Sequence, residues 1–433
     1  MTDDDDRPPL AALARGFRKR TLVTTRVMAR LGLAMVKKNL SAAQLDAEVD
    51  EDDAVAAARE LLEQLDGLKG LTMKLGQMLS YTDSSLPPRA RRVLGRLQAA
   101  SRPVDGDAIA EVIRSELGGA PADLFARFEP RPFAAASIGQ VHRAELDGRA
   151  WAVKVQYPGI EELLRADVAT VGRLARLATL LSPLDGRGLV EELAARVLDE
   201  CDYVREADNQ ARFGALLAGD PDLVVPAVRA DRSTRRVLTT ALCDGLDFDG
   251  FVAAAPQAAR DRAGAAIYRA CFGSLFGHGV YNADPHPGNY RFTADGRVTL
   301  LDFGCVKEFP PDFMARWKRL ARAVLADDRA AFRQAWLDAG FVGRARGFDF
   351  DHQLAALRVL YRPMLATEPF RFTHAYVAEV HDRLAFRNAN KLKLAMPPDW
   401  LFVNRMQFGL FSVLAHLGAT VRYDRIFRAA LDA

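Results

Sequence analysis

Four short motifs, in a fixed order along 433 residues, restrict the fold of this chain more than any other feature. An alanine-rich loop at 134–141 comes first, and a strand-like run that contains Lys154 follows it. Asp284 and Asn289 lie five residues apart, and Asp302 begins an Asp-Phe-Gly triplet thirteen residues further on. In this order the motifs supply a loop over phosphates, a lysine to bind them, a carboxylate base and oxygen ligands for a metal. Together they predict a nucleotide-binding site.

The bulk composition sets broad limits on the kind of protein. A chain of this length can bury the cores of two or three packed units. Its net charge of +3 is close to balance, which argues against a nucleic-acid binder. The cysteines are scattered and form no C-x-x-C pair, so we expect reduced thiols in a cytosolic chain and no zinc site. They are Cys201, Cys243, Cys271 and Cys305.

The N-terminal region is the part whose pattern suits a membrane surface. Residues 10–38 carry basic side chains and no acidic ones, with apolar residues at roughly helical spacing. Such a helix can lie on an anionic membrane, or it can pack on the domain with its basic face in solvent, and the sequence leaves both open. No apolar run approaches the roughly 20 residues of a membrane-spanning helix. The nearest, 400–417, is interrupted by polar residues and predicts a buried core helix.

No signal peptide is visible at the acidic start of the chain. We therefore expect a cytoplasmic protein without a transmembrane helix. Peripheral contact with the inner face of the cell membrane, through residues 10–38, is kept as an alternative.

The hydrophobic pattern changes along the chain from helical to strand-like and back to helical. Residues 52–118 have a helical pattern, and the glycines at 118 and 119 end it. The strand-like runs 140–146 and 150–156 flank Asp147-Gly148, which is a hairpin turn signal. Further strands are predicted near Phe128 and at 222–228 and 236–242, and further helices at 159–181, at 189–217 and from Gln257 onward. A short hairpin at 290–301, with Asp295-Gly296 at its turn, interrupts the last helical region.

This order predicts an α+β chain with a small β-rich lobe followed by a helical lobe, and with the catalytic motifs at the start of the second lobe. We expect four parts. An acidic tail and basic amphipathic helix occupy 1–50, and a helical extension occupies 51–120. The β-rich lobe with helical inserts covers 121–245, and the helical lobe covers 246–433.

The alanine-rich loop departs from the kinase glycine loop, G-x-G-x-x-G-x-V. Ala134 and Ala136 occupy the first two glycine positions, and Gly139 occupies the third. The Cβ of alanine restricts φ and hinders close approach of the backbone to phosphate, so we expect a looser cover, and taken alone the run could be an ordinary turn. The nucleotide contacts predicted in this lobe come from Ala134, Ala135, Ala136, Ser137, Gly139, Val141, Ala152 and Lys154.

Lys154 lies between residues of the buried type, and a buried ammonium needs an anionic partner. Nucleotide phosphates and a carboxylate on a helix would provide one. Asp202 and Glu206 are four residues apart and would share one helix face, whereas Glu200 would point elsewhere. We favour Glu206 as the partner of Lys154.

Asp284 and Asn289 match the D-x-x-x-x-N pattern of a kinase catalytic loop. Asp284 is predicted to be the catalytic carboxylate that orients or deprotonates an acceptor hydroxyl or a water. Asn289 and Asp302 offer an amide and a carboxylate oxygen, which are ligands that Mg²⁺ prefers. His286 fits no familiar metal spacing, so we interpret it as a scaffold residue. The predicted cofactors are therefore ATP and Mg²⁺.

Two further motifs make the chain resemble the UbiB family of atypical protein-kinase-like proteins, also called the ADCK or AarF-like family. Lys-Leu-Gly-Gln at 74–77 corresponds to the KxGQ motif of that family, and Glu-Cys-Asp at 200–202 corresponds to its ExD motif. The alanine-rich loop, the Ala-Asp-Pro-His-Pro-Gly-Asn run at 283–289 and the Asp-Phe-Gly triplet add to the match. The resemblance covers roughly 68–309.

The resemblance implies a protein-kinase-like fold whose N-terminal helical extension lies over the active site. Lys74 and Gln77 would meet Glu200 and Asp202 there and gate the site. The implied activity is ATP binding with slow, Mg²⁺-dependent hydrolysis or phosphotransfer. The implied role is the biosynthesis or handling of isoprenoid quinones, so the expected partners are a nucleotide and an isoprenoid lipid or quinone precursor. Whether the chain forms a homodimer is left open.

Two features bear on the rival interpretations. Asn282 stands where many relatives have His, which changes the local hydrogen bonding beside the catalytic Asp. A helical pattern resumes by Pro311, soon after the Asp-Phe-Gly triplet, so the chain leaves little platform for a peptide substrate. One alternative is a nucleotide-regulated, lipid-binding pseudokinase with little turnover. The other is a small-molecule phosphotransferase of the aminoglycoside or choline kinase type.

Overall fold

The computed structural model describes residues 104–136, 138–166, 198–391, 393–395 and 397–433. They divide into two compact units. Unit 1 contains the described residues up to Val204 together with Arg229–Thr239, and unit 2 contains Arg205–Val228 and Thr240–Ala433. The four-part division that we expect from the sequence stays a prediction, because its first part and most of its second lie outside the described residues.

Unit 1 is built on a five-stranded sheet with the order β1-β3-β4-β6 and with β2 paired to β3. The antiparallel hairpin of β3 and β4 turns at Asp147 (φ 52°) and Gly148 (φ 69°). Two left-handed residues in succession are what a tight type I′ hairpin turn requires, so the predicted hairpin is confirmed. The strands are β1 (Arg127–Phe128), β2 (Ala134–Ala135), β3 (Gly139–Leu146), β4 (Arg149–Gln156) and β6 (Val237–Ala241).

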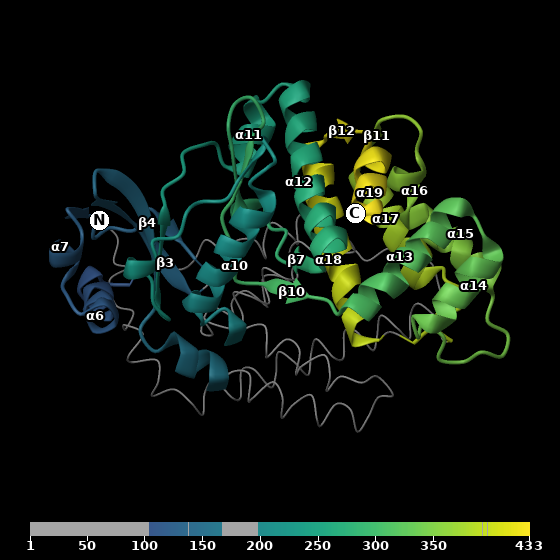
Figure 1. Ribbon diagram of the computed structural model, residues 1–433, viewed down its shortest axis with the longest axis horizontal. Coiled ribbons are helices and arrows are strands. Elements are labelled where there is room, and N and C mark those ends of the chain that lie inside the picture. Colours follow the sequence, from purple (N-terminus) through teal and green to yellow (C-terminus); the bar gives the residue numbers. More distant parts are fainter. Residues whose placement is uncertain (1–103, 137, 167–197, 392, 396) are drawn as a thin grey trace, which may run out of the picture. The chain divides into compact units, whose positions relative to one another are not determined.

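Helix α6 (Gly106–Leu117) packs against β4 (Figure 1). Its buried side chains repeat at helical spacing, at Ile109, Val112 and Ile113, because a surface helix buries one stripe. The helix ends at Gly118, whose φ of 78° gives the left-handed cap that glycine adopts most easily, as predicted. Unit 1 also contains the short helix α7 (Pro121–Leu124) and the 3-10 turn η2 (Ala230–Arg232). Residues 160–166, the described part of the predicted helix 159–181, are helical as well.

The predicted continuous helix over 189–217 is wrong in its described part. Residues 198–199 are helical, 200–201 form a turn, and α10 (Tyr203–Leu217) begins only after Asp202. The carbonyl of Cys201 accepts a hydrogen bond from Gln156 Nε2 at 2.8 Å, and the Tyr203 amide donates to the carbonyl of Arg235 at 3.1 Å. These partners near the edge of the sheet take the backbone groups that a continuous helix would need.

Unit 2 begins at Arg205 within α10, and it contains two small sheets. One sheet has the order β5-β9-β8, and the other pairs β10 with β7 antiparallel. The predicted hairpin at 290–301 is confirmed by the antiparallel pair of β8 and β9. The strands are β5 (Leu223–Val224), β7 (Val280–Asn282), β8 (Tyr290–Phe292), β9 (Val298–Leu300) and β10 (Val306–Glu308).

Helices make up the rest of unit 2. The long helix α12 (Gln257–His278) follows α11 (Phe248–Ala254) and leads into β7. The C-terminal elements are α13 (Pro311–Ala326), α14 (Arg329–Asp338), α15 (Phe350–Leu360), α16 (Arg362–Leu365), β11 (Phe370–Arg371), α17 (His374–His381), the π-helical turn η4 (Asp382–Phe386), α18 (Pro398–Leu417), β12 (Thr420–Val421) and α19 (Tyr423–Asp432).

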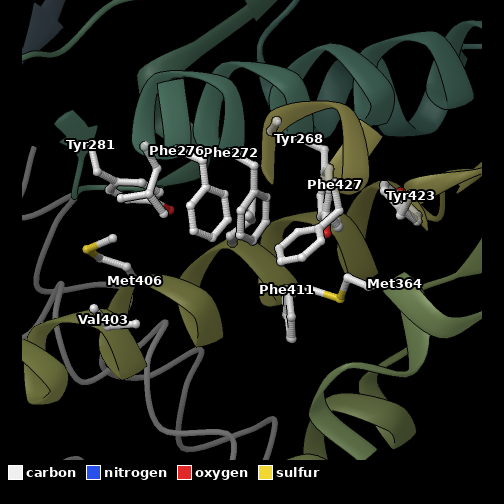
Figure 2. Close-up of a cluster of buried hydrophobic side chains, with 14 of the residues drawn as sticks. Tyr268, Phe272, Phe276, Tyr281, Met364, Val403, Met406, Phe411, Tyr423 and Phe427 are labelled. Carbon is white, nitrogen blue, oxygen red and sulfur yellow. The ribbon is translucent and has the colours of Figure 1, made fainter. Parts of the chain in front are cut away.

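The core of unit 2 is a row of aromatic side chains along α12. Phe272 and Phe276 contact Phe427 of α19 with ring centroids 5.1 and 5.4 Å apart, and Tyr268 lies 4.7 Å from Tyr423 (Figure 2). Helix α18 lies in the same core, with Phe411 fully buried, which confirms the predicted core helix at 400–417. Aromatic rings bury more apolar area than most side chains, so this row of rings anchors α12, which leads into β7.

Candidate active site

Five of the predicted nucleotide-binding residues of unit 1 share one face of its sheet. Ala134 pairs with Val141, and Val141 pairs with Lys154, so the three residues form a row across β2, β3 and β4. Ala152 and Gly139 face the same side because side chains alternate along a strand. The register therefore brings five of the predicted residues together. Ala135, one residue on from Ala134, faces the opposite side.

The alanine-rich loop is a tight turn between β2 and β3. The amide of Ala136 donates to the carbonyl of Gly139 at 2.8 Å, and Ser137 lies outside the described residues. Ala134 belongs to an extended strand, a conformation that does not need glycine. A Cβ at Gly139 would lie 2.3 Å from the carbonyl oxygen of Val155. The glycine at the third position is therefore required by packing against β4.

The surroundings of Lys154 include an aromatic ring at the start of α10. Its Nζ lies over the ring of Tyr203, 4.9 Å from the centroid. Asp202 precedes the helix and accepts from the Val204 amide at 3.1 Å, so it does not share a helix face with Glu206 as the sequence led us to expect. The reason is the break in the helix at 200–202. The Oδ2 atom of Asp202 also lies 3.7 Å from the Nη1 atom of Arg235.

In unit 2, Asp284 and Asn289 are positioned between two short strands. Helix α12 ends at Gly279, whose φ of 66° turns the chain into β7. Asp284 follows β7, and Asn289 closes the 3-10 turn η3 (Pro287–Asn289) directly before β8. The Nδ2 of Asn289 donates to the Asp284 carbonyl at 2.9 Å and to its carboxylate at 3.3 Å. An amide binds a hard cation through its oxygen, and these two hydrogen bonds of Asn289 use only its nitrogen.

Asn282 links the catalytic loop to the Asp-Phe-Gly triplet. Its Nδ2 donates to the carbonyl of Asp302 at 2.6 Å, and its Oδ1 accepts from the Asp284 amide at 3.4 Å. The Asp302 carboxylate accepts from the Gly304 amide at 2.9 Å. Although asparagine replaces the histidine of many relatives, it offers both a donor and an acceptor. The two segments that carry the predicted catalytic and metal residues are therefore joined through one side chain.

Helix α10 contributes residues that sequence reasoning missed. Asn209 Nδ2 donates to the carbonyl of Phe303 at 3.1 Å, and the ring of Phe213 packs on that of Phe303 with centroids 5.2 Å apart. Glu206, three residues before Asn209, is only 2% exposed, and a buried carboxylate requires a compensating cation or hydrogen bonds. Residues 206, 209 and 213 are three and four apart and so share one helix face. This spacing could have predicted that Asn209 and Phe213 lie on the same side of the helix as Glu206.

A cavity of about 30 Å³ lies beside the catalytic loop, enough for one or two waters. Its walls are mostly apolar. Burial raises the pKa of the Cys271 thiol to about 12, so this wall residue stays protonated. Asp284 is thus backed by apolar surface rather than by bulk solvent. The lining residues are Phe213, Ile267, Ala270, Cys271, Asn282, Asp284, Asn289, Tyr290 and Leu300.

His286 accepts a hydrogen bond from the Gly288 amide through Nδ1 at 2.9 Å, which shapes the loop as a scaffold residue would. Within the described parts of the chain, no three His, Cys, Asp or Glu residues gather in a group that could hold a metal. The oxygen atoms of Asp302 and Asn289 still suit Mg²⁺, because this ion commonly takes one or two protein ligands and completes its shell with phosphates and water.

Several predicted site residues are not tested by these contacts. Lys74 and Gln77 lie outside the described residues, so gating by them with Glu200 and Asp202 stays a prediction. Lys154 belongs to unit 1 and Glu206 to unit 2, and their pairing stays a prediction as well.

Comparison with known proteins identifies the family. Residues 96–336, more than half of the chain, match the ABC1 atypical kinase-like domain. The chain belongs to this family. Over 408 residues it is 31% identical to the atypical kinase COQ8B, mitochondrial, of Rattus norvegicus, covering 91% of this chain and 76% of the relative. The corresponding protein of Danio rerio is 30% identical over 87% of this chain, and the match spans 61% of that relative.

A solved structure supports the fold of this ABC1-family protein. The complex of Rv3197 with erythromycin from Mycobacterium tuberculosis is 30% identical, with a TM-score of 0.63. The match covers 86% of this chain and 94% of that one. The predicted UbiB-type family and the protein-kinase-like fold are therefore both confirmed, and the chain is an atypical kinase by family.

Proposed function

We propose that this ABC1-family protein binds ATP with Mg²⁺ and catalyses slow phosphotransfer or hydrolysis. The observation that carries the proposal is the hydrogen-bonded set of Asp284, Asn289 and Asp302 in unit 2. Asn282 and Asn289 donate amide hydrogen bonds to the two aspartate segments, at distances from 2.6 to 3.3 Å. Pre-ordered carboxylates of this kind serve catalysis because they need not reorganise when charge develops.

Each residue has a distinct proposed role. Lys154 binds the phosphates, with Glu206 as its carboxylate partner. The carboxylate of Asp302 and the amide oxygen of Asn289 hold the metal, which when bound neutralises charge on the phosphates. Asp284 accepts the proton of the attacking hydroxyl or water, because its carboxylate is fixed by Asn289 and lies beside an apolar cavity.

The proposed acceptor is an isoprenoid lipid or a quinone precursor at a membrane surface. Support comes from the family and from relatives named as COQ8-type atypical kinases of mitochondria, which we connect with ubiquinone-like biosynthesis. Among the described residues, no helix combines the length and the apolar character needed to cross a bilayer. We therefore propose peripheral contact through the basic segment 10–38.

The test is Mg²⁺-dependent ATP hydrolysis by the purified protein, with and without anionic liposomes. The variants Asp284→Asn and Asp302→Asn are measured beside it. We expect turnover that rises with liposomes, that falls at least about 100-fold in Asp284→Asn, and that is lost in Asp302→Asn together with Mg²⁺-dependent nucleotide binding. Wild-type binding of Mg²⁺-ATP in Asp302→Asn would overturn the metal assignment.

A second candidate is a nucleotide-regulated binding protein with little turnover. Strand β10 ends at Glu308 and α13 begins at Pro311, so the segment that carries a peptide substrate in ordinary kinases is very short. The related Rv3197 was solved with erythromycin, a large ligand that is not a nucleotide. ATP binding without hydrolysis, in buffer and with liposomes alike, would favour this function. Family membership argues against an aminoglycoside or choline kinase type of enzyme.

A further inference from the structure

Tyr203 is the aromatic residue whose ring lies beneath the ammonium of Lys154. The Nζ is 4.9 Å from the ring centroid, and the side chain of Tyr203 is fully buried. A cation within about 6 Å of the centre of an aromatic face is attracted by the negative charge of that face. The attraction is larger where water is excluded, as it is around a buried ring.

The ring is fixed to the strand that carries the lysine. Gln156, two residues beyond Lys154 on β4, is buried and donates to the carbonyl of Cys201 at 2.8 Å and to that of Arg235 at 3.1 Å. The Tyr203 amide also donates to the Arg235 carbonyl at 3.1 Å. The break in the helix at 200–202 is thus the means by which Tyr203 is placed under β4.

The hydroxyl end of the ring lies at the base of the alanine-rich loop. A Cβ at Gly139 would lie 3.1 Å from the Tyr203 hydroxyl oxygen, so the hydroxyl faces the side of Gly139 on which a side chain would stand. Gly139 and Lys154 are both on the sheet face that carries the predicted nucleotide contacts. One aromatic side chain therefore lies beside both the glycine that follows the loop and the lysine of this site.

We propose that Tyr203 is a positioning residue that holds the ammonium of Lys154 in place for the nucleotide phosphates. The inference rests on the proposed function, in which Lys154 binds phosphate. A lysine side chain has many rotamers, and ordering it before the nucleotide arrives lowers the entropic cost of binding. Tyr203 then raises the affinity for ATP through Lys154, and it does not affect a ligand that lacks phosphates.

A double-mutant cycle tests this coupling. The dissociation constants of Mg²⁺-ATP and of adenosine are measured by calorimetry for the full-length wild type, Tyr203→Leu, Lys154→Met and the double variant, with Tyr203→Phe as the matched control. We expect Tyr203→Leu to lose about 2-fold to 30-fold in affinity for ATP, and less than 2-fold for adenosine. Tyr203→Phe keeps the ring and should bind as the wild type does. The double variant should bind ATP as Lys154→Met does.

The outcomes separate this inference from the function on which it rests. If Lys154→Met leaves the ratio of ATP to adenosine affinity unchanged, the phosphate-binding role of Lys154 is wrong. If Lys154→Met lowers the ratio but the effect of Tyr203→Leu is additive, only the positioning role is wrong. Should Tyr203→Leu unfold, phenylalanine with one, two and three ring fluorines at position 203 keeps the shape. ATP affinity should then fall with each fluorine, and a constant affinity would refute the inference.

Discussion

Replacing Gly139 by alanine tests whether this glycine serves the fold or the nucleotide. The added Cβ would lie 2.3 Å from the carbonyl oxygen of Val155 and 2.9 Å from its carbonyl carbon. Both are backbone atoms of β4, and Val155 is fully buried in the sheet. Since neither strand can rotate away as a flexible side chain would, β3 and β4 must separate by roughly 1 Å to restore van der Waals contact.

Overpacking of this kind costs about 1–3 kcal/mol in the free energy of unfolding. In a unit of 150–250 residues that corresponds to a melting temperature lower by about 2–12 °C. The measurement is thermal unfolding without nucleotide, followed by circular dichroism. The control is Gly219→Ala, because a Cβ there meets no atom within 4 Å and the residue has no positive φ. We expect the control to melt within about 2 °C of the wild type.

The result that would refute this reasoning is a Gly139→Ala protein with the melting temperature of the wild type and weakened ATP binding. Glycine would then be present for close approach of the ligand, as in a glycine loop. Ala136→Gly separates the two cases further. It should change nucleotide affinity only if the loop contacts phosphate, because glycine there relaxes the loop backbone.

Three other perturbations follow from the described contacts. Asn282→Leu should weaken Mg²⁺-ATP binding and lower kcat, because the partly buried carbonyl of Asp302 loses its partner at a cost of about 1 kcal/mol. Asn282→His should restore part of both, and equal kinetics for all three proteins would contradict the link. Burial lowers the pKa of His142 below its ordinary 6.5. The protein should therefore lose stability as the pH falls below 6.5, because the unfolded chain takes up the proton first. The urea midpoint of the wild type should fall from about pH 8 to about pH 5 for this reason, and the fall should be smaller in His142→Gln. Arg269→Met breaks two partly buried ion pairs and should lower the free energy of unfolding by about 1–2 kcal/mol, measured by urea denaturation. Arg316→Met, at an exposed ion pair with Asp312, should leave the urea midpoint at the wild-type value.

Short-range features of this protein could be predicted because they depend on neighbours in the chain. Asp147 and Gly148 both adopt the positive φ values that the turn of the β3–β4 hairpin requires. Because side chains alternate between the two faces along a strand, the position of this turn then determines the face on which Lys154 lies. The spacing of Asp284 and Asn289 places both between β7 and β8. The interrupted apolar run at 400–417 identified a core helix for the same reason, since helical periodicity is local.

Contacts between distant residues were decided by the tertiary structure alone. Asn282 meets Asp302 across 20 residues, and Gln156 meets Cys201 across 45. Neither pair leaves a signal in the sequence pattern. The hydrogen bond to the Cys201 carbonyl lies where the chain leaves the helical conformation before Tyr203. Periodicity alone predicts a helix through 200–202, and the structure has none there. A glycine in the loop likewise suggested phosphate, whereas Gly139 is needed because the β4 backbone occupies the space of its Cβ. Local patterns in the chain were enough to predict the hairpins and the core helix, whereas packing between segments decides how the residues of the candidate site are held, because steric exclusion and hydrogen-bond satisfaction depend on neighbours in space.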